Sequence, residues 1–260
     1  MTPPTDSDLW LRLVPGGGTE NPTLWWAAAR FMQGARRFEE LQALLGTFAQ
    51  SWQGYPRVRR DVGTGELMIG ELGDEFLTTR PEASALASEA IFHFRAALDA
   101  AIYQLAWRGR GRRPRGTMFP FCRDASQWSQ RRRNDLRGLE QRHVAAVEAV
   151  QPFNGVTWSA NLAELSNRDK HDHTLEIAAI YKCRVDLTSE YSAPGPIGTV
   201  ALGVHDPELQ FVFVPLDRVI DANATDAATD ELVVIMRGIV DFLNPLLAQE
   251  GISTIQLVSA

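Results

Sequence analysis

The longest helical pattern in the chain lies between Ser84 and Trp107. Its apolar residues recur at intervals of three and four and so share one stripe: Ala87, Ile91, Phe94, Leu98, Ile102 and Leu105. Such a stripe is typical of a helix that packs against a core. Pro81 precedes it and Ser84 is a favourable N-cap residue. We therefore predict a helix over residues 84–107 and expect the rest of the chain to be organised around it.

Further segments show the same periodicity. Residues 22–52 predict a helix in which Gly34 is a point of interruption, and a short helix is expected to begin within residues 160–165. Residues 134–150 predict a helix with His143 on its inward face as a hydrogen-bonded core histidine, ended by Gln151-Pro152. The last helix is expected at about 226–249, with these residues inward: Leu232, Ile235, Ile239, Phe242 and Leu246.

Other segments alternate with a period of two or are rich in β-branched residues. Residues 55–72 alternate around Gly63-Thr64-Gly65 and predict a β-hairpin. The segments 177–187, 199–204 and 209–216 predict an antiparallel sheet of about three strands, which the hairpin could join. The expected fold class is α+β: a predominantly helical bundle with a small antiparallel β-sheet.

The chain is long enough for one domain with a sizeable core. Residues 1–21 are rich in proline and glycine and predict a flexible N-terminal arm. Residues 22–260 are expected to form a single α+β domain. Within it we expect a helical core at about 81–175, a β-rich part at about 177–216 and the C-terminal helix at about 226–249.

Composition excludes several classes of protein. Of the 260 residues, 45% are apolar and 22% charged, which is ordinary for a globular protein. No apolar run approaches the roughly 20 residues of a membrane span, and the N-terminus lacks a secretory pattern, so we expect a cytoplasmic protein without a membrane partner. Two separated cysteines favour neither a disulfide framework nor structural zinc. Phosphate-loop, dinucleotide, serine-hydrolase and zinc-protease motifs are absent from the sequence, so no cofactor is expected.

Charge is distributed very unevenly. Residues 108–142 hold 11 arginines against three acidic residues, a local charge of +8, so that −14 lies elsewhere in a chain of net charge −6. Such a field attracts RNA or another polyanion, or the acidic remainder of a second subunit. The arginine, glycine and proline loop after Trp107 could also be a solvated linker. The candidate nucleic-acid-binding residues are Arg108, Arg110, Arg112, Arg113, Arg115, Arg131, Arg132 and Arg133.

Two polar constellations could carry chemistry. Arg95 and Asp99 border the apolar stripe four residues apart, so they can pair, either as a helix edge or facing a cleft or a subunit interface. Residues 166–173, SNRDKHDH, place Asp169, His171 and His173 at a period of two, which suits metal ligands on a strand. The favoured interpretation is a loop in which Asn167 and Asp169 cap the backbone, without a metal.

These motifs resemble a widespread family of uncharacterised proteins from GC-rich bacteria and their phages. Members carry a helix close to GDxLHNLRSALDH, then FP, QP and NxDKHR. The counterparts here are SEAIFHFRAALDA at 88–100, Phe119-Pro120, Gln151-Pro152 and NRDKHD at 167–172. The match covers about residues 81–175.

That family is similar to HEPN proteins, helical bundles that commonly dimerise and in many members cleave RNA through an Arg-x4-6-His motif. The family's RSALDH is such a motif, but the position of its histidine is Ala100 here, and Asp172 replaces the closing arginine of DKHR. His93 lies about two turns from residue 100 and is not a simple substitute.

The resemblance and the residues together support two hypotheses. The first is a non-catalytic HEPN-like binding or scaffold protein, a homodimer that presents the arginine-rich face to nucleic acid. The second is a metal-independent HEPN-type ribonuclease of a toxin or phage-defence system. Its candidate catalytic residues are Arg95, Asp99, Asp169 and His171, with a histidine of the octapeptide as the base and Arg95 stabilising charge at phosphorus.

Overall fold

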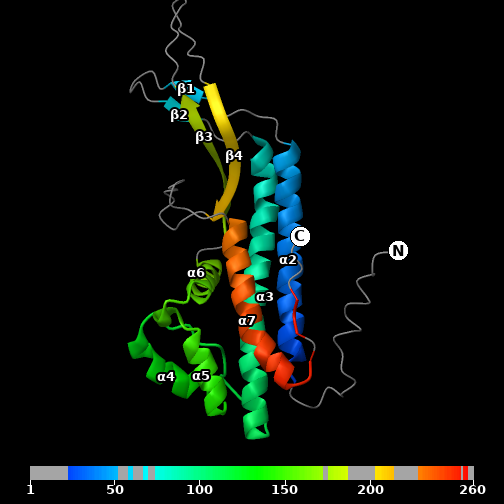
Figure 1. The fold of residues 1–260 in the computed structure, drawn as a ribbon, viewed down its shortest axis with the longest axis vertical. Coiled ribbons are helices and arrows are strands. Elements are labelled where there is room, and N and C mark those ends of the chain that lie inside the picture. The colour runs from blue at the N-terminus through cyan, green and yellow to red at the C-terminus, as the bar shows by residue number, and fades with distance from the viewer. Residues whose placement is uncertain are drawn as a thin grey trace, which may run out of the picture. The chain divides into compact units, whose positions relative to one another are not determined.

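The computed structural model describes residues 23–51, 58–60, 67–69, 74–171, 175–186, 203–213, 228–252 and 254–256 (Figure 1). The helices of this part are α2 (Trp25–Ser51), α3 (Asp74–Arg110), α4 (Ala125–Asp135), α5 (Gln141–Ala149), α6 (Thr157–His171) and α7 (Ala228–Gln249), with the short 3-10 helix η1 (Pro152–Asn154). The strands are β1 (Val58–Arg60), β2 (Leu67–Ile69), β3 (Ile177–Asp186) and β4 (Gly203–Phe213). The predicted arm over residues 1–21 lies outside the described residues.

The predicted α+β class is wrong, because the protein is mostly helical. Helices account for 77% of the part of the chain whose side chains the structure describes. Among the described residues, β1 pairs only with β2 and β3 only with β4, both antiparallel, so the expected small sheet of about three strands is not formed. The helical component of the prediction fits the structure.

The predicted second and third strands are one strand. Residues 203–213 run without interruption through Pro207, which lies between the two predicted segments. The register shifts between Lys182 and Arg184 of β3, opposite Asp206 and Pro207. A bulge already lacks a ladder hydrogen bond, so a proline without an N–H is tolerated there.

The chain divides into two compact units. The first comprises residues 1–41, 85–175 and 230–260, and the second residues 42–84 and 176–229. In the second unit the rings of Phe48 and Phe211 meet edge to face with centroids 6.0 Å apart. An ion pair of 2.6 Å joins Arg80 and Glu176. These contacts tie the described helical ends of that unit to the β3–β4 pair.

Helix α3 is longer than its sequence pattern indicates. It begins at Asp74, so Pro81 and Ser84 lie inside it and Ser84 is not its N-cap. The Ser84 hydroxyl instead accepts a hydrogen bond of 3.1 Å from the backbone N–H of Ile177. A serine near an expected helix start is a local signal, and here a residue 93 positions away uses the hydroxyl.

In the first unit α2 continues through Gly34 without the expected interruption. A Cβ atom at Gly34 would lie 2.6 Å from Cδ1 of Phe94, so the glycine allows the two helices to approach closely. The rings of Phe31 and Phe94 lie 5.6 Å apart, and both side chains are fully buried. Figure 1 shows α2, α3 and α7 side by side as long helices, with α4, α5 and α6 on one flank.

The helix predicted over 134–150 is wrong at its start. Helix α4 ends at Asp135, and α5 begins only at Gln141. Gly138 between them has a φ of +96°, a left-handed conformation that suits glycine and reverses the chain. Helix α4 gives little periodic signal because Trp128 is its single buried apolar residue. By contrast α7 confirms the predicted C-terminal helix, with all five expected inward residues buried.

Candidate functional site

Arg95 and Asp99 form the predicted pair on α3 and hold the backbone of Phe119. Nε of Arg95 lies 3.2 Å from Oδ2 of Asp99. Nη2 of Arg95 donates to the carbonyl oxygen of Phe119 at 2.8 Å, and the Phe119 N–H donates to Oδ1 of Asp99 at 2.7 Å. The pair therefore satisfies both backbone groups of a residue that lies outside any helix or strand.

The flat face of Arg95 is also occupied. Its guanidinium carbon lies 4.4 Å from the centroid of the Phe121 ring, within cation–π range. The Arg95 side chain is only 14% exposed. A carboxylate, a carbonyl oxygen and an aromatic ring thus engage one guanidinium, which leaves little of it to contact a phosphate.

Gln151 anchors the other end of the same segment. Its Oε1 accepts the N–H of Cys122 at 3.0 Å, and its Nε2 donates to the carbonyl oxygen of Val147 at 3.0 Å. The Gln151 residue is completely buried. The N–H of Phe153 donates to the Cys122 carbonyl at 3.3 Å. Gln151 of the QP dipeptide therefore holds the segment that begins with the FP dipeptide, and we call residues 119–122 the clamped segment.

A second ion pair lies close to the first. Asp135, at the end of α4, is 5% exposed, and its Oδ2 lies 2.9 Å from Nε of Arg131. That oxygen makes no aligned hydrogen bond within the described part of the chain. Burial raises the pKa of Asp135, Arg131 and Arg95 oppose the rise, and Asp99 adds to it. The two pairs therefore form one electrostatic cluster around the clamped segment, in which burial also raises the pKa of the Cys122 thiol.

The raised pKa of Asp135 predicts a pH dependence of stability. The folded state holds the proton more tightly than the unfolded chain, so this group favours folding below its ordinary pKa. Its contribution is lost as the pH rises from the ordinary to the raised folded pKa. As the pH is raised from about 3 to about 7, we expect the free energy of unfolding of the wild type to fall relative to that of the Asp135→Asn protein. This range of about four units brackets ordinary carboxyl pKa values. Urea unfolding at each pH measures this, and parallel curves for the two proteins would contradict it.

The octapeptide does not form the predicted loop. Helix α6 continues through His171, which places Asn167 and Asp169 in its last turns. Asp169 is half-buried. Among the described residues, no hydrogen bond or ion pair connects Asp169 with Arg95 or Asp99. The side chain of His171 and all of His173 lie outside the described residues.

The structure therefore brings together two of the four candidate catalytic residues, Arg95 and Asp99. It adds Asp135 and Gln151, which the sequence analysis did not place at the site. Asp135 gave no signal, since one acid among three in an arginine-rich stretch looks like a surface residue. Gln151 had a signal in the QP dipeptide, which indicates the end of a helix and is one of the motifs shared with the family, but neither interpretation assigns Gln151 to the site.

Two histidines of the described part form no hydrogen bond or ion pair with Arg95 or Asp99: His143 is buried and His93 is half-buried. Burial lowers the pKa of His93. The charged residues that also affect this pKa are Arg30, Glu89 and Arg37, and Arg95 is not among them. Burial likewise lowers the pKa of His143. The prediction that His143 points inward is confirmed, but its Nδ1 has no hydrogen-bond partner among the described residues, so it is not the satisfied histidine that was expected.

Three members of the predicted arginine-rich face are bound to other polar side chains of the protein. Arg108 pairs with Glu250 at 2.7 Å, and the second carboxylate oxygen of Glu250 accepts the Leu24 N–H at 2.9 Å. Arg131 pairs with Asp135, and Arg132 donates to Gln141 at 3.0 Å.

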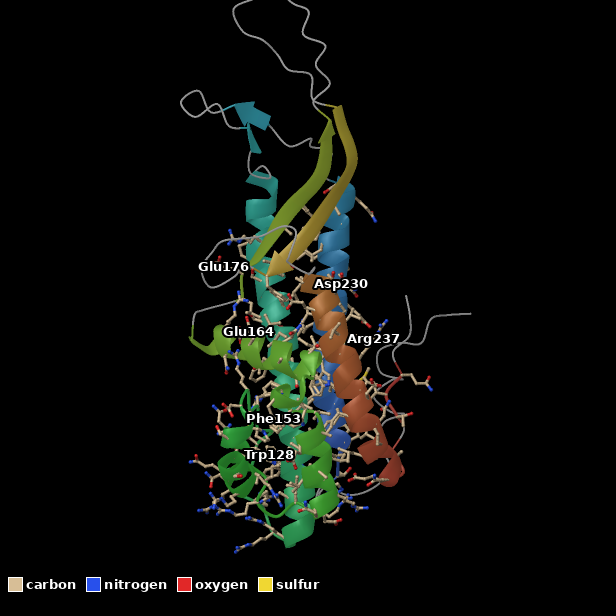
Figure 2. All side chains as sticks on the ribbon, turned by 60° about the vertical axis from the view of Figure 1, so that its left-hand side comes forward. Trp128, Phe153, Glu164, Glu176, Asp230 and Arg237 are labelled. Carbon is tan, nitrogen blue, oxygen red and sulfur yellow. The ribbon has the colours of Figure 1, made fainter. Side chains whose placement is uncertain are left out.

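The remaining members of the face form no ion pair with a carboxylate within the described residues. The Arg110 side chain lies against Gly138, where a Cβ atom would overlap it. The other four are exposed: Arg112, Arg113, Arg115 and Arg133. In Figure 2 many side chains tipped with nitrogen gather at the lower end of the first unit, around α4 and the end of α3. The cationic field predicted from the sequence is thus concentrated at one end of this unit.

No protein-family model, curated protein or solved structure matches the chain. No helix within the described ranges is long and apolar enough to cross a bilayer. Nor does the described part of the chain gather three His, Cys, Asp or Glu side chains in a position to hold a metal ion.

Proposed function

We propose that this chain is a non-catalytic binding or scaffold protein with a HEPN-like helical core, and that it binds RNA through the exposed arginines at the end of α3 and on α4. The observation that carries the proposal is the engagement of Arg95. Its guanidinium is bound to Asp99 and Phe119 and covered by Phe121. An arginine held in this way stabilises the fold, whereas a catalytic arginine must reach the phosphate.

Ala100 supports the same conclusion. In the family that the sequence resembles, this position carries the histidine of the Arg-x4-6-His motif. A methyl group cannot act as a general base, so the helix that would supply both catalytic groups supplies neither in usable form.

The exposed arginines would attract the phosphates of RNA. Arg112, Arg115 and Arg133 are exposed, and within the described residues they form no ion pair with a carboxylate. Cations that are not neutralised internally can displace the counterions of a polyanion, which makes binding dependent on salt. The surrounding acidic groups are occupied instead, because Glu250, Asp135 and Glu140 pair with Arg108, Arg131 and Arg142.

An RNA-binding measurement tests the proposal. Fluorescence anisotropy with a labelled single-stranded RNA, in EDTA and at a series of salt concentrations, should show binding that weakens as salt rises. The Arg112→Ala/Arg115→Ala protein should bind about tenfold more weakly and reduce the slope of log K against log salt by about 1 to 2. The matched control is Arg237→Ala, an exposed arginine that Figure 2 labels on α7, away from the arginine-rich end.

Other outcomes contradict the proposal in different ways. An affinity that salt does not change would exclude a phosphate-driven interface. RNA cleavage in EDTA that disappears in Arg95→Ala, while that variant remains folded, would establish the ribonuclease instead. The homodimer expected from the HEPN resemblance is checked by light scattering, where a mass near the 28.9 kDa of one chain at micromolar concentration would contradict it.

A further inference from the structure

Aromatic side chains lie among the exposed arginines at the end of α3. The rings of Tyr103 and Trp107 meet edge to face, with centroids 6.0 Å apart and planes inclined at 77°. The guanidinium carbon of Arg113 lies 5.2 Å from the centroid of the Trp107 ring. Both aromatic residues are half-buried and Arg113 is exposed. Aromatic rings and a guanidinium plane are therefore already assembled into a partly accessible surface at the start of the arginine-rich stretch.

The loop after α3 carries two further exposed arginines. Gly111 and Gly116 at its two ends have φ of +65° and +68°, and no atom lies within 4 Å of a Cβ built at either position. Between them Pro114 is buried, while Arg112 and Arg115 are exposed. The buried proline anchors the loop, and the two exposed arginines are close in the chain to Arg113, which lies over the Trp107 ring.

We propose that this surface binds single-stranded RNA, with an unpaired base stacked on the Trp107–Arg113 pair and the adjoining phosphates next to Arg112 and Arg115. The inference rests on the proposed RNA binding and adds the form of RNA that is bound. A base stacks on an aromatic ring or on the plane of a guanidinium, and positive side chains alongside follow the backbone.

Duplex RNA fits this surface less well. Each base of a duplex is covered on both faces by its neighbours, so stacking on Trp107 or Arg113 would require a base to leave the helix. Arginines alone would bind the phosphates of single-stranded RNA and of duplex RNA alike. The aromatic component is therefore what distinguishes a single strand from a duplex, and it can be removed without removing the charge.

The experiment compares two RNA probes on four proteins. Anisotropy is measured with a labelled oligoadenylate of about 12 nucleotides, and with an RNA duplex of the same length, at about 0.1 M salt. The proteins are the wild type, Arg113→Lys, Trp107→Leu and the control Arg237→Lys. Arg113→Lys keeps the charge and loses the plane, and as a change at an exposed residue it should fold normally.

We expect Arg113→Lys and Trp107→Leu each to weaken single-strand binding by about tenfold. Duplex binding should change by less than about twofold, and Arg237→Lys should match the wild type. Suppose instead that the wild type binds both probes with equal affinity and that the two variants leave these affinities unchanged. That result would overturn the stacking inference but not the proposal that the arginines bind RNA. If the wild type bound neither probe, the proposed function itself would be overturned.

Discussion

Replacing Arg95 with alanine is expected to lower the free energy of unfolding by about 3 kcal/mol. The substitution removes a charged hydrogen bond to the Phe119 carbonyl and the contact over the Phe121 ring, and it removes the cation that pairs with Asp99. The loss of the ion pair itself contributes little, because Asp99 is 37% exposed. Urea denaturation followed by circular dichroism measures the change.

The chain offers a matched control for this prediction. Arg36 and Glu40 form another pair four residues apart on a helix, with Nε and Oε1 3.3 Å apart, but the Arg36 side chain is 53% exposed. Arg36→Ala should therefore cost less than about 0.5 kcal/mol. An equally small cost for Arg95→Ala would show that the Arg95 contacts do not stabilise the fold, and it would return Arg95 to the candidates for a functional role.

Replacing Gln151 with leucine is expected to cost about 2 to 3 kcal/mol. Leucine fits a similar volume but cannot accept the N–H of Cys122, which would remain buried without an acceptor. The carbonyl of Val147 would lose a donor as well. The same urea measurement applies, with Gln130→Leu on the exposed face of α4 as the control that should change stability little.

The two substitutions should also be coupled. Arg95 and Gln151 hold opposite ends of the clamped segment, so losing either anchor loosens the segment that the other one binds. In the Arg95→Ala/Gln151→Leu protein the combined loss should fall short of the sum of the single losses by about 0.5 kcal/mol or more. Strict additivity would mean that the two ends of the segment are held independently.

The sequence by itself determined the helices whose apolar stripe is complete. Helix α7 lies almost where its pattern placed it, because a continuous inward face needs only local spacing to be recognised. The pairing of Arg95 with Asp99 was equally accessible, since residues four apart on any helix are neighbours. The sequence also located the cationic stretch that the structure gathers at the end of α3 and on α4.

Only the tertiary structure decided where α3 begins, that the chain turns at Gly138, and that residues 203–213 form one strand. It also decided what Arg95 and Gln151 bind. Their partners lie 24 and 29 positions away, in a segment whose backbone groups carry no signal in the sequence. Periodicity reports which face of an element is buried, but a hydrogen bond between distant residues exists only once packing has brought them together, and the same arginine could otherwise have reached a phosphate.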